Sequence, residues 1–467
     1  MLCARSRQVF IQSSDGQRAG TGRNLALQAG RRRGTAIALT ICTILGIALA
    51  NILVAILTPG FEGEQAALTA TLARIMFPSV IFMGLGMVVT GILNANHRYG
   101  VAAFAPGFSN IIIIISVIAF SSTFGVKGLA VGTLISFLGT LLIQLPVLKK
   151  VGFHYHFVLD LKHPGVRQVI HDILPIVLGV AVNQIYFAIN RIFASGLADG
   201  TISALNYANK VMMLPLGIFV AAVVAVIYPS LSEHSIKKEF KPMAQSLQKG
   251  LGLVSIIAIP AAIALIVLRV PIIELLFERG AFDSAATQAT ANALLFFVIG
   301  LWPMAMNMVL TRVFFALGDV KNPLIMGGWS ILVNVVLSLG LYRLIPFGGG
   351  GLALANSVAA IVNMLLFLIW LRRPLPDLQG KHLFISNLKI FLASLIMGVV
   401  LFFGWQGLTA VYTGSLLVQV CIMVVLGILV YAVAVFLLRV DEVKYLKEII
   451  SKRLKSSVDK TKAQMGK

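Results

Sequence analysis

The sequence predicts an all-α, polytopic membrane protein with about twelve transmembrane helices. Three observations predict this class. The 467-residue chain is 58% hydrophobic and only 12% charged, so it carries more apolar surface than a water-soluble core could bury. The apolar residues gather in twelve segments that are each long enough to cross ~30 Å of hydrocarbon as a helix. Positive charge is abundant in alternate loops and sparse in the loops between them.

The twelve predicted spans are distributed evenly along the chain. The first half holds residues 35–58, 72–94, 104–122, 128–148, 173–195 and 205–230. The second half holds residues 250–268, 288–310, 324–345, 350–371, 388–405 and 415–438. An even number of spans puts both termini on the same side of the membrane.

The basic residues orient these spans. Most of the 38 Lys and Arg residues lie in the loops on one side, including Arg31, Arg32 and Arg33 directly before the first span. Lys and Arg near span ends are retained on the cytoplasmic side, so we expect both termini in the cytoplasm. The net charge of +21 is spread over all the inner loops instead of one soluble face, which argues against nucleic acid as a partner.

The two terminal segments are basic and outside the spans. Residues 1–34 lack the apolar core of a signal peptide, and either a disordered leader or a misplaced start would give this composition. Residues 441–467 place apolar side chains at helical spacing among Lys and Arg. This tail either lies along the anionic inner leaflet among the membrane lipids or forms a solvated helix.

Residues that would indicate enzyme chemistry are not grouped. The three cysteines lie far apart, and His154 and His156 have no Cys or acidic neighbours at zinc spacing. The run Gly348–Gly351 lacks the Lys-Ser/Thr pair of a phosphate-binding loop, so it predicts a turn. We expect no enzyme, no catalytic residues, no metal site and no cofactor.

Polar residues inside the fifth and sixth spans predict the candidate binding site. Each costs free energy in lipid, so it tends to face protein or water. They recur on one face of each helix: Asn183, Gln184, Asn190 and Arg191 in the fifth span, and Asn206, Tyr207, Asn209 and Lys210 in the sixth. Either they line a cavity near the outer side, or Arg191 and Lys210 reach out to lipid headgroups.

The charges near the spans indicate an anionic substrate. None of the 17 carboxylates lies well inside a predicted span, where a cation exporter usually needs one. Arg191, Lys210, Arg279 and Arg312 offer cations instead, and such groups bind phosphate or pyrophosphate. Seven prolines within or at the ends of spans bend their helices, either around a transport cavity or simply for packing.

Several motifs in fixed order resemble the MviN/MurJ family of lipid II flippases. They include Asn190-Arg191-Ile192-Phe193-Ala194-Ser195, Tyr207-Ala208-Asn209-Lys210, Phe277-Glu278-Arg279-Gly280-Ala281-Phe282 and Arg312-Val313-Phe314-Phe315 before Gly318-Asp319. The resemblance runs from about residue 35 to 440. It implies an inner-membrane flippase that moves undecaprenyl-pyrophosphate-linked disaccharide-pentapeptide, lipid II, to the outer leaflet for peptidoglycan synthesis.

The resemblance also implies an organisation. The family has fourteen helices in two bundled lobes and a C-terminal helix pair, so this chain is expected to lack the family's first two. The implied segments are the leader 1–34, the rest of the N-terminal lobe 35–165, the C-terminal lobe 166–375, the final helix pair 376–440 and the tail 441–467. The implied partners are lipid II, membrane lipids, and cell-wall synthesis and division proteins. Alternatives are another exporter of the superfamily, for polysaccharide-lipids or drugs, and a truncated protein that transports nothing.

Overall fold

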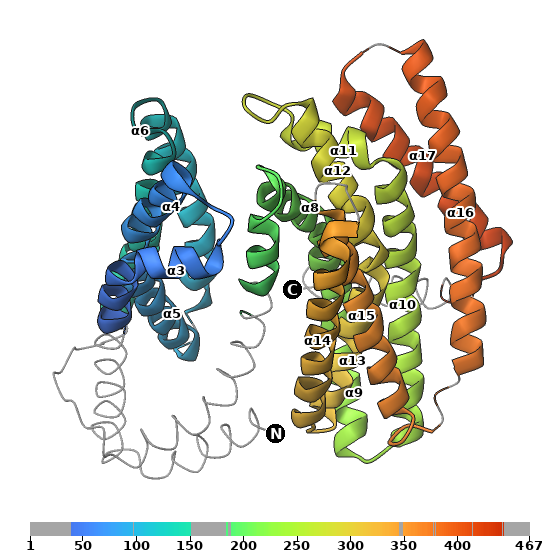
Figure 1. The fold of residues 1–467 in the computed structure, drawn as a ribbon. Coiled ribbons are helices and arrows are strands. Elements are labelled where there is room, and N and C mark those ends of the chain that lie inside the picture. The colour runs from blue at the N-terminus through green and yellow to red at the C-terminus, as the bar shows by residue number, and fades with distance from the viewer. Residues whose placement is uncertain are drawn as a thin grey trace, which may run out of the picture. The chain divides into compact units, whose positions relative to one another are not determined.

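The computed structural model describes residues 39–96, 98–150, 184, 188–344, 349–376, 378, 380–412, 414–440 and 442, and every regular element in these ranges is a helix (Figure 1). The all-α class is therefore confirmed. The chain divides into two compact units, Met1–Ala188 and Ile189–Lys467. The predicted leader and all but Glu442 of the predicted tail lie outside the described residues.

The described helices coincide with the predicted spans. Nine helices are long and apolar enough to cross a membrane, and two bent helix pairs raise the number to eleven within the described residues. These eleven match the predicted segments in order, and the fifth, at residues 173–195, falls largely outside the described ranges. The first span is not one straight helix, because Leu39–Ala48 and Ala50–Leu57 meet at 74°.

The first unit continues from this bent pair into three helices, the last of which contains two spans. After α3 (Ala50–Leu57) come α4 (Gly63–Met76), α5 (Ser79–Ala95) and α6 (Tyr99–Lys150). Arg74 of α4 donates a hydrogen bond to the side chain of Asn51 in α3 over 3.1 Å, which ties the bent segment to the next helix. Thr90 of α5 donates to Gln144 of α6 over 2.9 Å. Gln144 is fully buried, so this bond satisfies a polar group inside the bundle.

Helix α6 is a hairpin of two spans that reverses at Gly125. The backbone of Gly125 has φ 54° and ψ −134°, a conformation that favours glycine. Beyond the turn, added Cβ atoms on Gly128 and Gly132 would lie only 2.7 Å from the Phe120 carbonyl oxygen and 2.4 Å from Ser116 Cβ. These small residues let the two halves pack closely, as helices in membranes commonly do.

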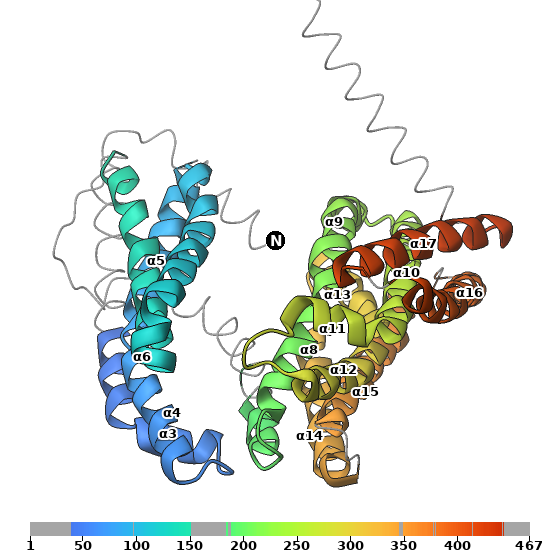
Figure 2. The same cartoon turned by 90° about the horizontal axis from the view of Figure 1, so that it is seen from above.

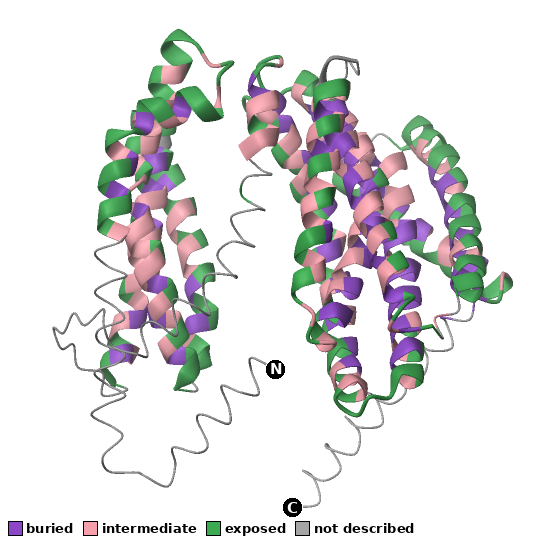
Figure 3. Ribbon diagram, turned by 60° about the horizontal axis from the view of Figure 1, so that its bottom comes forward, coloured by how far each residue is buried: buried purple, intermediate pink, exposed green. Residues whose placement is uncertain are grey.

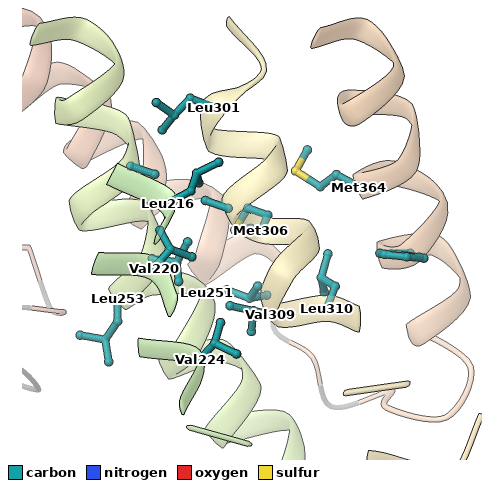
Figure 4. Close-up of a cluster of buried hydrophobic side chains, with 14 of the residues drawn as sticks. Leu216, Val220, Val224, Leu251, Leu253, Leu301, Met306, Val309, Leu310 and Met364 are labelled. Atoms are coloured by element: carbon teal, nitrogen blue, oxygen red, sulfur yellow. The ribbon is translucent and has the colours of Figure 1, made fainter. Parts of the chain in front are cut away.

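The second unit holds the larger core. Its helices are α8 (Thr201–Pro215), the π-helical turn η2 (Leu216–Val220), α9 (Ala221–Ile236), α10 (Phe240–Val267), α11 (Arg269–Phe277), α12 (Ser284–Ile299), α13 (Leu301–Ala316), α14 (Lys321–Leu344) and α15 (Gly350–Leu371). Buried side chains of η2, α9, α10 and α13 pack together, among them Leu216, Val220, Leu251 and Met306 (Figure 4). Burial is concentrated around α10, which is more enclosed than any other unbroken span in the described residues (Figure 3).

Two of these spans are broken near prolines that the sequence predicts to bend their helices, whereas Pro106, Pro146 and Pro260 lie inside helices α6 and α10 that continue past them. The π-helical turn follows Pro215 directly, and α12 and α13 meet at 46° around Gly300, shortly before Pro303. A Cβ on Gly300 would lie 2.8 Å from Ser357 Cα, so glycine is needed for α15 to approach the break. The Ser357 hydroxyl contacts the carbonyl oxygens of Phe296 and Phe297 at 2.7 and 3.1 Å. A neighbouring side chain thus satisfies backbone groups at the break.

The last two helices, α16 (Gly380–Val411) and α17 (Leu416–Leu437), pack on each other beside α10 at the edge of the second unit (Figure 2). Their outward faces are rich in exposed apolar side chains, including Phe403 and Phe436. Such faces suit contact with lipid acyl chains.

Candidate functional site

A polar contact joins the fifth predicted span to α14. Asn190 Nδ2 donates to Asn334 Oδ1 over 3.1 Å, and Asn334 is completely buried. Ser338 lies one turn further along α14 and is also fully buried. Asn334 Nδ2 and Ser338 Oγ have no hydrogen-bond partner among the described residues. Asn190, which is partly buried, therefore bonds to a fully buried polar group inside the second unit.

Lys210 lies against an aromatic cluster made of Tyr207, Phe277 and Phe282. Its ammonium nitrogen is 5.6 Å from the centroid of the Tyr207 ring. That ring in turn packs on Phe277 at 4.7 Å and edge-on to Phe282 at 5.4 Å. Lys210 is exposed and makes no ion pair with any residue in the described ranges. The arrangement leaves the positive charge available to an anion, while a cation–π contact orients it.

Arg279 lies on the loop between the two phenylalanines of this cluster. Its guanidinium donates to the carbonyl oxygen of Leu276 at the end of α11, a contact that helps to cap that helix. The rest of the guanidinium is exposed. Because Tyr207 contacts both Phe277 and Phe282, the cluster brings the segment that carries Lys210 beside the loop that carries Arg279.

Three carboxylates lie in or beside this loop and reduce its net positive charge. Glu278 accepts a hydrogen bond from the hydroxyl of Thr287 over 2.6 Å, which fixes the loop to α12. Burial, and then the charge of Glu278, raise the pKa of the Glu274 carboxyl above its ordinary value. Asp283 accepts from the backbone N–H of Ala286 and caps the start of α12. The loop is thus held by its own hydrogen bonds.

Arg312 does not join this group. Its guanidinium carbon lies 5.9 Å from the Tyr228 ring centroid and 6.0 Å from that of Phe315, near the opposite end of the span that contains α8 and α9. Tyr228 is eighteen positions after Lys210, roughly 27 Å along a helix. Arg312 therefore stays a separate predicted phosphate contact, because it lies far along the span from Lys210.

The remaining predicted residues are placed as follows. Asn183 lies outside the described residues, and Gln184, Arg191 and Asn206 are exposed. Arg191 makes no hydrogen bond or ion pair with another residue of the described ranges. In the described part of the chain, no group of three or more His, Cys, Asp or Glu side chains could hold a metal ion.

Asn334 and Ser338 are the polar residues that the sequence reasoning did not single out. They stand four positions apart, and Ser330 lies four positions before Asn334, so these polar residues share one face of α14. That spacing is the signal that could have found them. The aromatic partners Phe277 and Phe282 belong to a recognised motif, but only the structure shows that they hold Tyr207.

Comparison with known proteins identifies relatives along nearly the whole described chain. The family described as "Lipid II flippase MurJ" matches residues 33–440. The lipid II flippase of Burkholderia cenocepacia is 31% identical over 387 residues, which are 80% of this chain and 74% of that protein. The probable lipid II flippase of Buchnera aphidicola subsp. Acyrthosiphon pisum is 32% identical over 378 residues, 78% of this chain and 72% of the relative.

Solved structures show the same relationship. An inward closed structure of the lipid II flippase MurJ aligns with a TM-score of 0.75 at 26% identity, covering 95% of this chain and 88% of its own. An inward-facing multidrug transporter of the MATE family aligns with a TM-score of 0.63 at 19% identity, covering 76% and 88%. At that identity the second likeness shows a shared fold alone.

Proposed function

Because the chain belongs to the lipid II flippase MurJ family, we propose that Lys210 and the aromatic cluster around it form the contact for the pyrophosphate of lipid II in the second unit. Membership makes the chain a lipid II flippase, a transporter for peptidoglycan synthesis and not an enzyme. It is accordingly a multi-pass protein of the bacterial inner membrane.

The exposed ammonium of Lys210 is the observation that carries the proposal. A headgroup with a pyrophosphate and sugars cannot cross hydrocarbon unaided. The transporter must therefore supply polar groups in place of the water that the headgroup loses. Cations do this best when neighbouring groups hold them in place before the anion arrives. The ring of Tyr207 holds Lys210 in this way, and Phe277 and Phe282 hold Tyr207. Arg279 can add a second cation from the adjoining loop.

The other candidates have supporting places in this proposal. Asn190, with Asn334, contributes buried polar groups within the same unit, whereas Gln184, Arg191 and Asn206 offer exposed polar side chains. Arg312 would meet phosphate at the opposite end of the span, where Tyr228 and Phe315 flank it. Asn183 remains a prediction from the sequence. We also propose that lipid II carries an undecaprenyl chain and that it is moved by alternating access.

The loop charges support an orientation with both termini in the cytoplasm. In that orientation an inside-negative potential favours outward movement of the anionic headgroup by about 2.3 kcal/mol per charge per 100 mV. The same charges support the segment boundaries proposed from the sequence, with a final helix pair at 376–440 and a cytoplasmic tail at 441–467. Cell-wall synthesis and division proteins remain proposed partners.

Depletion and rescue test the proposed function. The chain is expressed in cells whose own lipid II flippase is depleted, and outer-leaflet lipid II is measured together with growth. We expect rescue by this chain and loss of rescue by Lys210→Ala at equal membrane abundance. Rescue by Lys210→Ala that equals the parent would remove Lys210 from the substrate path. Failure of the parent chain itself would contradict its competence to flip lipid II.

A further inference from the structure

The final helix pair attaches to the second unit mainly where α16 packs along α10. Two apolar clusters form the joint: one around Ile256, Ile390 and Val435, and one around Leu268, Met397 and Met423. Inside a bilayer, an apolar side chain gains little by leaving lipid for another helix. Close approach of small residues and polar contacts must therefore determine where the pair docks.

Both kinds of contact are present. A Cβ on Gly398 of α16 would lie 2.6 Å from Ile263 Cγ2, so glycine allows α16 to lie directly on α10. The hydroxyl of Tyr431 in α17 donates to the carbonyl oxygen of Ile256 in α10 over 2.8 Å. A third contact comes from the residues just after α17.

Glu442 provides this third contact and is unusual in its burial. Its side chain is only 5% exposed, and it is the one charged residue among the buried side chains of the described ranges. Ser386 Oγ of α16 donates to Glu442 Oε2 over 2.5 Å. An added Cβ on Gly252 of α10 would lie 2.6 Å from Glu442 Oε1 and 2.7 Å from its Cγ. Glu442 therefore sits in a space that exists because residue 252 has no side chain.

The path of the chain brings Glu442 back onto the bundle. Arg439 has φ 49°, a left-handed conformation that disfavours residues other than glycine, so the turn needs support from its surroundings. The N–H of Val440 bonds back to the Val435 carbonyl over 3.3 Å, and the Val440 side chain is buried in the cluster with Ile256 and Ile390. Val440 and Glu442 together supply that support.

We propose that Glu442 is a positioning residue that fixes the α16–α17 pair to α10 where α17 ends. It acts by fit and by accepting the Ser386 hydrogen bond: its carboxylate bonds to α16 and fills the space above Gly252 in α10. The α16–α17 pair then moves together with the second unit, whichever lipid the protein carries. Burying a carboxylate inside a membrane protein costs free energy unless its oxygens are hydrogen-bonded. Here a donor and a space of matching size are both present, which indicates that the burial of Glu442 is a specific feature of the fold.

Spin-label distances in the full-length chain test this proposal. The labels are placed at Lys237→Cys and Leu437→Cys, both exposed positions, in a chain whose three native cysteines are replaced by Ser. The protein is reconstituted in lipid nanodiscs, and the width of the distance distribution is compared between variants. The disruptive variants are Glu442→Ala and Gly252→Ala. Gly250→Ala is the matched control, because its Cβ would come closest, at 2.8 Å, to the flexible Cδ1 end of Ile227, and no atom of Glu442 is among its nearest neighbours.

We expect a single narrow distribution in the parent chain, in Gly250→Ala and in Glu442→Gln, which keeps the side-chain length and an acceptor oxygen. Glu442→Ala and Gly252→Ala should broaden it at least twofold. A narrow distribution in both disruptive variants would overturn the proposal. Equal broadening in Gly250→Ala would also overturn it, because any added methyl group on α10 would then have the same effect. Broadening in Glu442→Gln would contradict docking by fit and hydrogen bonding, since glutamine retains both.

Discussion

Asn190 and Asn334, which are 144 residues apart in the sequence, are joined by a 3.1 Å hydrogen bond from Asn190 Nδ2 to Asn334 Oδ1. The bond links the end of the fifth predicted span to the middle of α14, inside the second unit. Because Asn334 is fully buried, its amide depends on this partner in place of water. The contact connects a residue chosen from the sequence for its polar face with one that the sequence did not single out.

Asn334→Ala should therefore destabilise the second unit. The substitution removes the acceptor of Asn190 and opens a small cavity, which together cost about 1–3 kcal/mol. Thermal unfolding in detergent measures the effect. Ser338→Ala, one turn away on α14, is the matched control: its hydroxyl is buried without a partner among the described residues, so its removal should leave stability unchanged or raise it. Equal losses in the two variants would contradict this account of the Asn190 contact.

Tyr207→Leu should weaken transport more than Tyr207→Phe. Phenylalanine keeps the ring contacts with Phe277 and Phe282 and the ring face below Lys210, whereas leucine loses interactions worth about 0.5–1.5 kcal/mol. The concentration of lipid II at half-maximal flipping in proteoliposomes measures the effect. It should rise a few-fold in Tyr207→Leu and stay near the parent value in Tyr207→Phe. An equal rise in the two variants would show that the hydroxyl, which both lack, is the important group and not the ring.

Glu274→Gln should stabilise the protein at neutral pH. The raised pKa of Glu274 means that the fold favours its protonated form, so its stabilising contribution is present at low pH and is lost as pH rises through the folded pKa. The glutamine side chain does not ionise, so the Glu274→Gln variant does not lose this stability as pH rises. Unfolding temperatures measured between pH 4 and 7.5 should show a gain for Glu274→Gln near pH 7 that disappears below the ordinary carboxyl pKa of 4.5. A gain that is the same at every pH would argue against titration of Glu274 as its cause.

Replacing Lys237, Lys238 and Lys241 together with Gln should leave flipping nearly intact. These residues are exposed, and the one ion pair among them, Lys237 with Glu233, lies at the surface, where such pairs contribute little. Their predicted role is to help retain this loop in the cytoplasm, and the other basic loops share that role. Flipping is measured at equal membrane abundance. A complete loss of flipping in the triple variant would mean that the loop takes part in transport.

Much of the fold can be predicted from the sequence, because a bilayer leaves few choices. Span length, helix content, the irregular turn after Pro215 and the break shortly before Pro303 follow from apolar periodicity and backbone chemistry, and the structure contains them. The 74° bend at Leu49 was not predicted, since no proline lies near it and Gly46, three residues before it, was not singled out in the sequence. It depends on packing and on the link between Arg74 and Asn51, which join only in three dimensions.

The sequence predicted which types of residue form the candidate site better than it predicted how they are arranged in space. Polar spacing identified Asn190 and Lys210, yet spacing along one helix says nothing about partners on another. Asn334 lies far away in the sequence, and Arg312, grouped with Lys210 for its charge, lies near the other end of the unit's span. Glu442 belonged to a predicted cytoplasmic tail, and only the structure shows it buried against α10 and α16.

Flipping by Lys210→Ala and Lys210→Arg, compared with the parent chain at equal membrane abundance, tests the central claim most directly. A charge-assisted contact to the pyrophosphate contributes about 1.5–3 kcal/mol, so the alanine variant should lose about 10- to 100-fold in flipping per molecule. Arginine keeps the charge above Tyr207 and should retain most of the activity. Flipping by Lys210→Ala equal to that of the parent, in chains of unchanged thermal stability, would contradict the account.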